Sequence, residues 1–315
     1  MQLIRGIYNL RDGQRGCVAT IGNFDGVHRG HQAVLEQLAR HARRLQRATT
    51  VITFEPTPQE YFSPATTPAR LTRLREKLTV FRQMQVDRVL CLPFGRRLAG
   101  MTAAEFIDHV LVHGLGVCYL VVGDDFRFGK DRRGDFAQLV AAGAAAGFPV
   151  ESTTTFIDAG ERVSSTRIRD LLAAGELDHA ERLLGRPYSM QGRVAMGDQR
   201  GRTIGFPTAN VHLHRRATPL TGVFAVRVLD LDDNPLPGVA NLGTRPTVEG
   251  TRPVLEVHLF DFDRDIYGAH VCVEFVQKLR DEKKFDSFDA LKKQIQLDAM
   301  AARECFSSQL RSSRV

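Results

Sequence analysis

The 315-residue sequence contains no tryptophan, only five tyrosines, and five cysteines that form no CxxC pair. An odd number of scattered cysteines does not indicate a disulfide framework. Four of the five lie in apolar, strand-like stretches: Cys17, Cys91, Cys118 and Cys272. Such positions predict buried thiols in a reducing compartment.

Long hydrophobic runs are also missing. The most apolar segment, residues 110–122, is interrupted by His113 and two glycines and is too short to span a bilayer. The first ten residues, MQLIRGIYNL, do not place a basic region before an apolar run, so no secretory signal is expected. We therefore expect a cytoplasmic protein that does not associate with a membrane.

The composition is 43% hydrophobic and 25% charged, which is typical of a folded globular protein. The net charge of +7 suits a polyanionic partner, either a nucleic acid or a phosphorylated small molecule. Basic residues are spread along the chain, so most of them are expected on solvated faces. RNA binding would predict stacking aromatics and an RNP-like run, and the sequence supplies no tryptophan and no such run.

The first half of the chain alternates short β-branched runs with longer segments of helical period. The predicted strands are residues 17–21, 50–54, 87–92 and 118–123. The predicted helices are residues 31–45, 102–112 and 136–147. This alternation predicts a doubly wound α/β domain built on a parallel sheet.

The second half changes to short alternating runs separated by turn residues, followed by one helical segment. The strands are expected at residues 223–231, 237–243, 254–260 and 270–276, and the helix at 288–306. The pattern predicts antiparallel β structure, either a small barrel or a sandwich. We place the domain boundary at the Gly185-Arg186-Pro187 joint, which gives domains of residues 1–185 and 186–315.

The stretch GNFDGVHRGHQ, residues 22–32, joins the first of these strands to a helix. In a doubly wound sheet this turn lies at the edge where ligands bind, and a helix N-terminus there favours a phosphate. Gly26 and Gly30 allow close backbone approach, and His28 and His31 can donate to developing phosphate charge. Half of a zinc site and a purely structural histidine pair are the alternatives, although further zinc ligands of suitable spacing are not found nearby.

Four motifs carry a family resemblance. They are GNFDGVHRGH (22–31), TFEPTPQEYF (53–62), VGDDFRFGKDRRGD (122–135) and VSSTRIRDLLAAGELDHAERLLGRPY (163–188). The first resembles the HxGH-type motif of nucleotidyltransferases. Together the four resemble the flavin adenylyltransferase module of the prokaryotic bifunctional riboflavin kinase/FAD synthetase family. The resemblance implies that this domain is built on a nucleotidyltransferase-like parallel sheet and that it acts as an FMN adenylyltransferase.

The resemblance also implies roles for individual residues of this module. It assigns catalysis to His28, His31 and Arg169, with Arg169 closing an SSTxxR element that holds the leaving phosphates. It assigns nucleotide binding to Asn23, Asp25, Gly26, Ser165 and Thr166. For Ser165 and Thr166, a helix N-cap is an alternative role that is compatible with the first.

The flavin site of this module is likewise implied by the resemblance. The side chains expected around the flavin are Phe54, Pro56, Pro58, Phe62, Asp125 and Phe128. An aromatic or proline face can stack on an isoalloxazine ring. The usual fate of a single phenylalanine is the hydrophobic core, and this alternative stays open.

The segments 201–211, 255–268 and 279–291 resemble the riboflavin kinase module, a six-stranded antiparallel barrel with a terminal helix. Within the PTAN element, Thr208 and Asn210 supply the hard oxygen atoms that suit Mg²⁺. The resemblance implies that Glu256 is the catalytic base for the riboflavin 5′-hydroxyl. By alternation alone, Glu256 would be an ordinary outward-facing strand residue.

Two further elements of the kinase module follow from the same resemblance. The glycine-rich stretch 192–205 is expected to form a mobile flap over the nucleotide, with Gly201 and Arg202 binding it. It is not a Walker A sequence, so on its own it is weak evidence. Arg280 is expected on the flavin side, and a solvated charge cluster is the alternative.

The family resemblance implies a cytoplasmic transferase with two active sites. The barrel would phosphorylate riboflavin to FMN with MgATP, and the α/β domain would adenylylate FMN with ATP to give FAD and pyrophosphate. ATP, riboflavin, FMN, FAD and pyrophosphate are the expected partners, Mg²⁺ is the expected cofactor, and nucleic acid is not a partner. Weak or transient self-association is left open, and a transferase acting on another nucleotide or sugar phosphate is the alternative enzyme.

Overall fold

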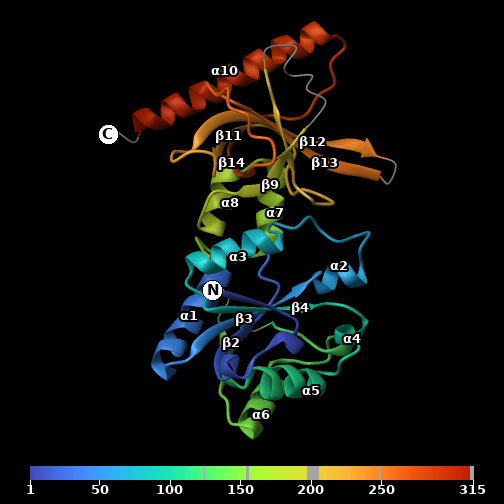
Figure 1. The fold of residues 1–315 in the computed structure, drawn as a ribbon, viewed down its shortest axis with the longest axis vertical. Coiled ribbons are helices and arrows are strands. Elements are labelled where there is room, and N and C mark those ends of the chain that lie inside the picture. Colours follow the sequence, from blue (N-terminus) through green and yellow to red (C-terminus); the bar gives the residue numbers. More distant parts are fainter. Residues whose placement is uncertain (124, 154–155, 197–205, 248–249, 313–315) are drawn as a thin grey trace. The chain divides into compact units, whose positions relative to one another are not determined.

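The computed structural model describes the chain except residues 124, 154–155, 197–205, 248–249 and 313–315 (Figure 1). The described chain divides into two compact units. The first contains Met1–Thr67 and Thr72–Ser164, and the second contains Pro68–Leu71 and Ser165–Val315.

The first unit is built on a six-stranded sheet in which all strands run parallel. Its strands are β1 (Gln2–Arg5), β2 (Cys17–Ile21), β3 (Ala48–Glu55), β4 (Arg88–Pro93), β5 (Val117–Gly123) and β6 (Val150–Thr153). The strand order is β1-β4-β3-β2-β5-β6. From β2, the chain adds β3 and β4 on one side and then places β5 and β6 on the other side of β2. The carboxyl end of β2 lies at this switch point, where open α/β sheets bind their ligands.

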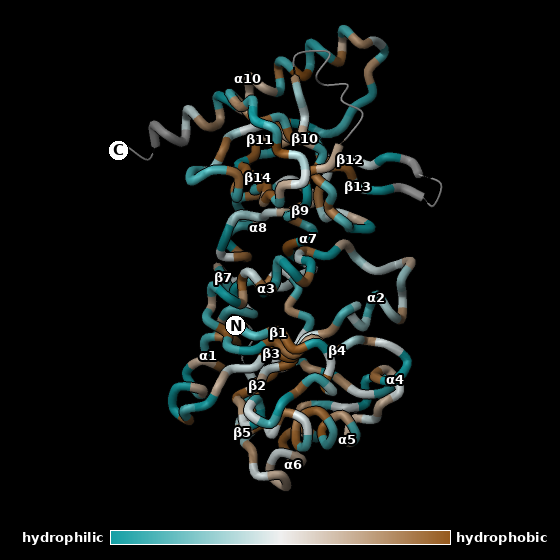
Figure 2. Tube along the Cα trace, viewed as in Figure 1, coloured by the Kyte–Doolittle hydropathy of each residue, from teal (hydrophilic) through white to brown (hydrophobic). Residues whose placement is uncertain are grey.

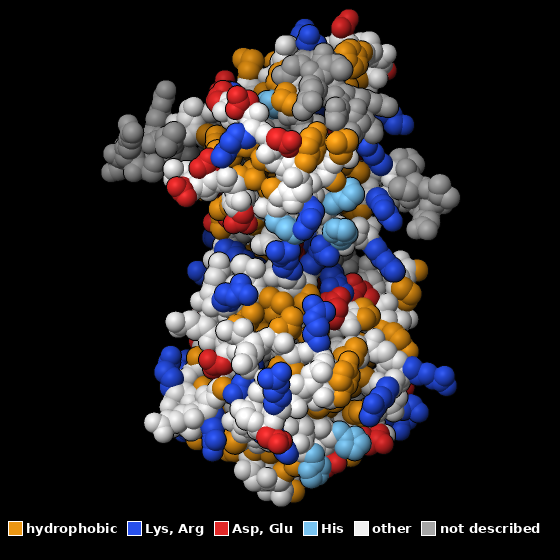
Figure 3. Space-filling view, in the orientation of Figure 1, with side chains coloured by type: hydrophobic (Ala, Val, Ile, Leu, Met, Phe, Trp, Pro, Cys, Tyr) orange, Lys and Arg blue, Asp and Glu red, His pale blue; other side chains and the backbone are white. Residues whose placement is uncertain are grey.

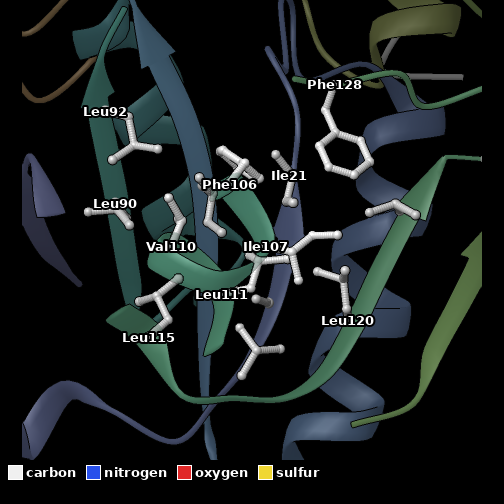
Figure 4. Close-up of a cluster of buried hydrophobic side chains, with 14 of the residues drawn as sticks. Ile21, Leu90, Leu92, Phe106, Ile107, Val110, Leu111, Leu115, Leu120 and Phe128 are labelled. Atoms are coloured by element: carbon white, nitrogen blue, oxygen red, sulfur yellow. The ribbon is translucent and has the colours of Figure 1, made fainter. Parts of the chain in front are cut away.

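Hydrophobic side chains cover both faces of this sheet. On one face, α1 (Arg29–Leu45) and α3 (Leu74–Gln83) pack on Val18, Val51 and Val121. On the other face, a larger cluster joins Ile21, Leu90 and Leu120 to the helical segment 103–115 (Figure 4). Brown, hydrophobic colour accordingly follows the central strands in Figure 2. Burial on both faces explains why these strands are continuous apolar runs.

The segment predicted as one helix at residues 102–112 has two parts. Thr102 caps α5 (Ala103–Phe106), and the Glu105 carboxylate accepts from the Thr102 N–H at 2.8 Å, so the expected capping box is confirmed. A π-helix, Ile107–Leu115, follows without a break and ends at Gly116. The helical prediction is correct in place and wrong in pitch.

Shorter elements complete the first unit. They are α2 (Pro58–Phe62), α4 (Arg96–Ala99), α6 (Phe136–Ala146), and the two-stranded pair β7 (Ile157–Asp158) and β8 (Glu161–Arg162). Single-turn 3₁₀ segments lie at Ile7–Asn9, Asp12–Gln14 and Lys130–Arg132.

The second unit contains a closed antiparallel barrel, so the open choice between barrel and sandwich is settled as a barrel. Its strands are β9 (Ser189–Ala195), β10 (Ala209–His212), β11 (Gly222–Leu229), β12 (Leu236–Thr247), β13 (Gly250–Leu259) and β14 (His270–Arg280). The order around the barrel is β10-β13-β12-β11-β14-β9, and β9 pairs with β10 to close it. Gly192 permits this closure, because a Cβ atom there would lie 2.5 Å from the His212 carbonyl oxygen.

Residues 192–195 form the end of β9. The expectation that the whole stretch 192–205 is a flap is therefore wrong for its first four residues. Residues 197–205, with Gly201 and Arg202, lie outside the described part of the chain.

In the part of the second unit that the structure describes, three helices accompany the barrel: α7 (Ser165–Ala174), α8 (Leu177–Leu184) and α10 (Phe288–Ser312). The long α10 packs on β11, β12 and β14, where Ala299, Ala302 and Cys305 cover Val223 and Val239 on the outside of the barrel. Gly185, at the predicted joint, ends α8 in the left-handed conformation with φ 74°. By internal contacts, α7 and α8 belong to the second unit, whereas the predicted boundary at residue 185 would place them in the first.

Candidate active sites

The loop that leaves β2 is wound tightly before α1 begins. Phe24, Gly26 and Val27 all have positive φ, at 49°, 85° and 41°. For Phe24 and Val27 this conformation is strained, and surrounding contacts must enforce it. Phe24 and Val27 are both buried in the core beneath α1, which fixes the loop from below.

Thr72, just before α3, and Lys77 within α3 also hold this loop. The Asp25 carboxylate accepts from the Thr72 N–H at 2.9 Å, and the Thr72 hydroxyl accepts from the Gly26 N–H at 2.8 Å. The fully buried Lys77 donates its ammonium to the Asn23 carbonyl at 2.9 Å. The predicted nucleotide residues Asn23, Asp25 and Gly26 therefore lie together in one rigid turn.

His28 and His31 lie at the N-terminus of α1. The buried His28 is the N-cap residue, and its Nδ1 accepts from the His31 N–H at 3.4 Å. The two rings stack with centroids 3.7 Å apart. A neutral imidazole that accepts at Nδ1 carries its proton on Nε2. The geometry combines two imidazoles with the positive end of a helix dipole.

The SSTxxR element lies on α7 of the second unit. The helix begins at Ser165, so Ser165 and Thr166 are its first two residues and Ser164 precedes it. Because both residues lie within the helix, neither occupies the N-cap position that was their alternative role. The Arg169 Nε donates to the Ala69 carbonyl at 2.7 Å, which ties α7 to residues 68–71 of the same unit.

The residues expected around the flavin begin at the carboxyl end of β3. Phe54 is buried in the core, Pro56 follows a cis peptide bond, and Pro58 is the first residue of α2. Phe62 at the end of α2 is 64% exposed, and its ring lies 5.7 Å from that of Phe94. Phe62 presents an open aromatic surface, whereas Phe54 is buried, and a flavin contact for either ring stays a prediction.

Phe54, Phe62, Phe94 and Tyr61 form one aromatic cluster. Phe94 contacts the other three rings at centroid distances of 5.6 to 5.8 Å. Sequence reasoning missed Tyr61 and Phe94. The EYF run could have indicated Tyr61, but Phe94 follows β4 and reaches the cluster only through the tertiary fold.

Asp125 and Phe128 lie in the loop after β5. The exposed Asp125 forms an ion pair with Arg162 at 2.8 Å. Phe128 is buried, with its ring 5.5 Å from the nearly parallel ring of Phe126 and 5.7 Å from Phe106. Core packing, the alternative role for Phe128, is what the structure contains. A flavin contact for Phe128 stays a prediction.

A cavity of about 390 Å³ lies in the second unit, between the outer face of the barrel and α10. It brings together all four described kinase residues of the sequence prediction: Thr208, Asn210, Glu256 and Arg280. The alternate residues Ala209, Val211 and Val257 line the barrel interior, so Asn210 and Glu256 point outward. Glu256 is thus an outward-facing strand residue that also lines a cavity.

Three neighbouring strands place a polar row on this face. Glu256 of β13 is the register partner of Asn210 on β10 and of Asn241 on β12. Directly paired residues have Cβ atoms about 4.5–5.5 Å apart. A carboxylate therefore lies between two carboxamides on the floor of the cavity.

The PTAN element is anchored at its first residue. The His258 Nδ1 donates to the Pro207 carbonyl at 2.9 Å, and the Phe206 ring lies 5.1 Å from the His258 ring. These contacts hold the chain just before Thr208, which lines the same cavity.

Basic side chains of the cavity pair with acidic ones. The Arg245 guanidinium donates to Oε1 of Glu256 at 2.6 Å. Arg280 binds both carboxylate oxygens of the buried Asp298 on α10, at 2.7 to 3.1 Å. Arg280 is therefore fixed in place, which disfavours the alternative of a loose solvated cluster. Sequence reasoning missed Asn241, Arg245 and Asp298.

The donor set at the cavity floor fits a hard divalent cation. Among the residues that the structure describes, groups of three or more His, Cys, Asp or Glu that could hold a metal do not occur. The hydroxyl of Thr208 and the amide oxygen of Asn210 match a cation such as Mg²⁺, which takes few protein ligands and completes its shell with water and phosphate oxygens.

Two features of the described chain concern possible partners: the charge on its surface and the apolarity of its helices. Lys and Arg side chains occur over much of the face in Figure 3, as expected for solvated positions. Among the described residues, no helix has both the length and the apolarity needed to cross a membrane.

Comparisons with known proteins assign the two halves of the chain to two classes of transferase. The FAD synthetase family model matches residues 10–167, and the riboflavin kinase family model matches residues 184–306. The first match contains the HxGH turn, and the second contains the barrel and its cavity.

Relatives match the chain over nearly its whole length. A bifunctional riboflavin kinase/FMN adenylyltransferase of Escherichia coli (strain K12) is 54% identical, covering 97% of this chain and 98% of that protein. One from Pseudomonas fluorescens is 55% identical, covering 96% and 97%. The chain belongs to the bifunctional riboflavin kinase/FMN adenylyltransferase family.

A solved structure supports the fold over the same length. It is a crystal structure named "Macrolide-efflux Protein" from Streptococcus pneumoniae, with a TM-score of 0.79 and 30% sequence identity. The likeness covers 96% of this chain and 99% of that one.

Proposed function

We propose that this chain makes FAD from riboflavin in two steps at two sites. The barrel unit phosphorylates riboflavin with MgATP to give FMN and ADP. The α/β unit then transfers AMP from a second ATP to FMN, which gives FAD and pyrophosphate. The observation that carries the proposal is the cavity that gathers Thr208, Asn210, Glu256 and Arg280 from separate parts of the barrel unit.

In the kinase step, Glu256 accepts the proton of the riboflavin 5′-hydroxyl. The hydroxyl oxygen forms a bond to the γ-phosphorus, the bond from that phosphorus to the β–γ bridging oxygen breaks, and ADP leaves with the electron pair. The half-buried position of Glu256 beside Asn210 supports this role. Thr208 and Asn210 would hold Mg²⁺, which when bound neutralises phosphate charge.

Arg280 and the residues after β14 support a flavin-side role. Asp298 locks the Arg280 guanidinium, and the Phe285 ring lies 5.7 Å from the guanidinium carbon. Lys283 donates to Gln294 of α10 at 2.6 Å and lies 5.1 Å from the same ring. These contacts give a preorganised polar and aromatic wall, which suits the flat, amphipathic flavin.

In the adenylyl transfer, the turn after β2 handles the triphosphate. A phosphate oxygen of FMN bonds to the α-phosphorus of ATP, and pyrophosphate leaves with the electrons of the broken α–β bridge. His28 and His31 donate to the phosphates at the N-terminus of α1, where helix dipole and N–H groups favour negative charge. Ser165, Thr166 and Arg169 are proposed to contact the departing phosphates.

The open aromatic surface of Phe62, with Pro56 and Pro58 before it, is proposed to contact the flavin in the adenylyl-transfer site. Asp125 and Phe128 follow β5 at the carboxyl edge of the sheet and are proposed to border the same flavin site. Gly201 and Arg202 keep their proposed role in nucleotide binding and lie outside the described residues.

The cellular setting of the proposal is the cytoplasm. All five cysteines are free, with Cys17, Cys91 and Cys305 buried and Cys118 and Cys272 half-buried. Burial raises the pKa of the Cys17 thiol to about 11, which keeps it protonated and unreactive. Free thiols are what a reducing compartment favours.

The direct test supplies the purified chain with one substrate at a time. With riboflavin, ATP and Mg²⁺, chromatography is expected to resolve FMN and then FAD. With FMN, ATP and Mg²⁺, FAD and pyrophosphate are expected without ADP. If the pure protein forms no FMN and no FAD in either incubation, the proposed function is wrong.

A further inference from the structure

Arg245 lies at a particular point of the kinase cavity. It is on the same outward-facing side of β12 as Asn241, four residues further along the strand. Its guanidinium reaches back along the barrel and donates to Oε1 of Glu256 at 2.6 Å. Arg245 and Glu256 both line the cavity with Thr208 and Asn210.

The position of Glu256 determines what Arg245 can contact. A γ-phosphoryl group in transfer must lie next to the hydroxyl that Glu256 deprotonates. It must also lie next to the oxygen ligands on β10, and Asn210 is the register partner of Glu256. A guanidinium within hydrogen-bond distance of Glu256 therefore borders the space in which the phosphoryl group is transferred.

The other cations that line the described cavity are held by α10. Arg280 binds both oxygens of Asp298, and Lys283 donates to Gln294. Arg245, by contrast, pairs with the carboxylate at the reaction centre, and its side chain is 48% exposed. This exposure makes the guanidinium accessible to a phosphate that enters the cavity.

We propose that Arg245 is a catalytic residue of the kinase step. When ATP enters the cavity, the Arg245 guanidinium moves away from Glu256 and binds the γ-phosphate. This rests on the proposed function of the barrel. A phosphate group carries more negative charge than a carboxylate and accepts the guanidinium fork in two parallel hydrogen bonds. The exchange frees Oε1 of Glu256 for the riboflavin hydroxyl at the moment when ATP is present.

The proposal gives the ion pair a function in both states. Without nucleotide, Arg245 neutralises Glu256 and so reduces its repulsion of the approaching triphosphate. With nucleotide bound, Arg245 stabilises charge on the transferring phosphoryl group, in which catalysis is chiefly electrostatic. A purely structural ion pair would persist through both states.

The experiment measures FMN formation by Arg245→Gln, Arg245→Lys and Arg245→Ala chains at saturating riboflavin and ATP. Arg245→Gln is expected to lower kcat about 10²- to 10³-fold, which is typical of removing one donor to a developing charge. Arg245→Lys, which keeps the charge but not the fork, is expected to retain more activity than Arg245→Gln. Millimolar guanidinium is expected to restore part of the activity of Arg245→Ala, because the added cation can occupy the vacated position.

Two controls belong to the same experiment. Arg252 is the register partner of Arg245 on β13 and is exposed, so Arg252→Gln is expected to keep kcat within about twofold. FAD formation from supplied FMN is expected to be unchanged in all four variants, which shows that the α/β unit is folded and active.

The outcomes separate this proposal from the proposed function. If the unchanged chain makes FMN but Arg245→Gln retains a kcat within threefold of it, Arg245 does not act on the phosphoryl group and the inference is overturned. A loss of activity that guanidinium does not restore in Arg245→Ala overturns it as well, since a structural loss has that signature. If the unchanged chain makes no FMN, the proposed function itself fails.

Discussion

Asn210 on β10 and Glu256 on β13 are register partners whose side chains leave the same outer face of the barrel. The pairing places a candidate metal ligand and a candidate base in one cavity, although they lie 46 positions apart in the sequence. The kinase site thus depends on strand register, because a slip of one residue would turn Glu256 into the barrel interior.

The first prediction concerns Glu256. Glu256→Gln keeps the shape of the side chain and removes its capacity as a base. FMN formation is expected to fall about 10²- to 10⁴-fold, the range that general base catalysis contributes. FAD formation from supplied FMN is expected to stay at the level of the unchanged chain, and chromatography of both flavins measures the two effects. An equal loss of both activities would contradict the assignment of Glu256 to the kinase site.

The second prediction concerns His28, which caps α1 and is proposed to donate to the phosphates of ATP. His28→Asn keeps a good N-cap residue but removes the imidazole donor. FAD formation from FMN is expected to fall about 10²- to 10³-fold, while FMN formation continues. Thermal unfolding of His28→Asn is expected to match that of the unchanged chain.

His28→Ala is the matched variant for the cap. It removes both the ring and the cap acceptor, so it is expected to lose FAD formation and also about 1 kcal/mol of stability. Full FAD formation by His28→Asn would show that the ring acts only through the cap.

The third prediction concerns the ion pair between Arg280 and Asp298. Because Asp298 is buried, Asp298→Ala leaves Arg280 without its counter-charge and is expected to destabilise the barrel unit by about 3–5 kcal/mol. The freed Arg280 is also expected to weaken riboflavin binding, which titration of flavin fluorescence measures. Glu304→Ala on the exposed face of α10 is the control and is expected to change stability by less than about 0.5 kcal/mol. Unchanged riboflavin affinity in Asp298→Ala would show that Arg280 does not need this anchor.

The fourth prediction is a dependence of stability on pH. Burial, together with the hydrogen bond from Tyr119 to Glu151 at 2.6 Å, raises the pKa of Tyr119 from 10.0 to about 12. A raised folded-state pKa stabilises the fold below pH 10, and this stabilisation is lost as the pH rises toward 12. Between pH 9 and pH 12, the free energy of unfolding measured by chemical denaturation is therefore expected to decrease less for Tyr119→Phe than for the unchanged chain. An identical decrease in both proteins would contradict the account.

Much of the α/β fold could be predicted because its signals are local. Residues 17–21 were predicted as a strand and form β2 with those bounds. The capping box at Thr102 and the helix stop at Gly147 are likewise short-range features. The edge strands β1 and β6 were missed, because four residues each carry too little pattern to separate them from a loop.

The parts that could not be predicted depend on distant contacts. Alternation at residues 223–276 indicated antiparallel strands, but closure into a barrel requires β9 to pair with both β10 and β14. The π-helix at Ile107–Leu115 has the apolar spacing of an ordinary helix, so its pitch is set by packing against the sheet. Propensity and period do not contain this information.

The candidate sites divide in the same way. The family resemblance supplied His28, Glu256 and the PTAN residues, and the fold gathers the PTAN residues and Glu256 in one cavity. Arg245 could not be found, because nothing in the local sequence indicates that its side chain meets Glu256, 11 residues away (256 − 245) across a hairpin. Asp298 could not be found either, because it is one of many charged residues along α10 and the local sequence does not indicate that its side chain meets Arg280.

The most direct test of two transfers at two sites follows labelled phosphorus from ATP into the flavins. With riboflavin, Mg²⁺ and ATP labelled at the γ-phosphate, label is expected in both FMN and FAD. With ATP labelled at the α-phosphate, label is expected in FAD and none in FMN. Label from the α-phosphate in FMN, or FAD that lacks the γ-label after starting from riboflavin, would contradict the account.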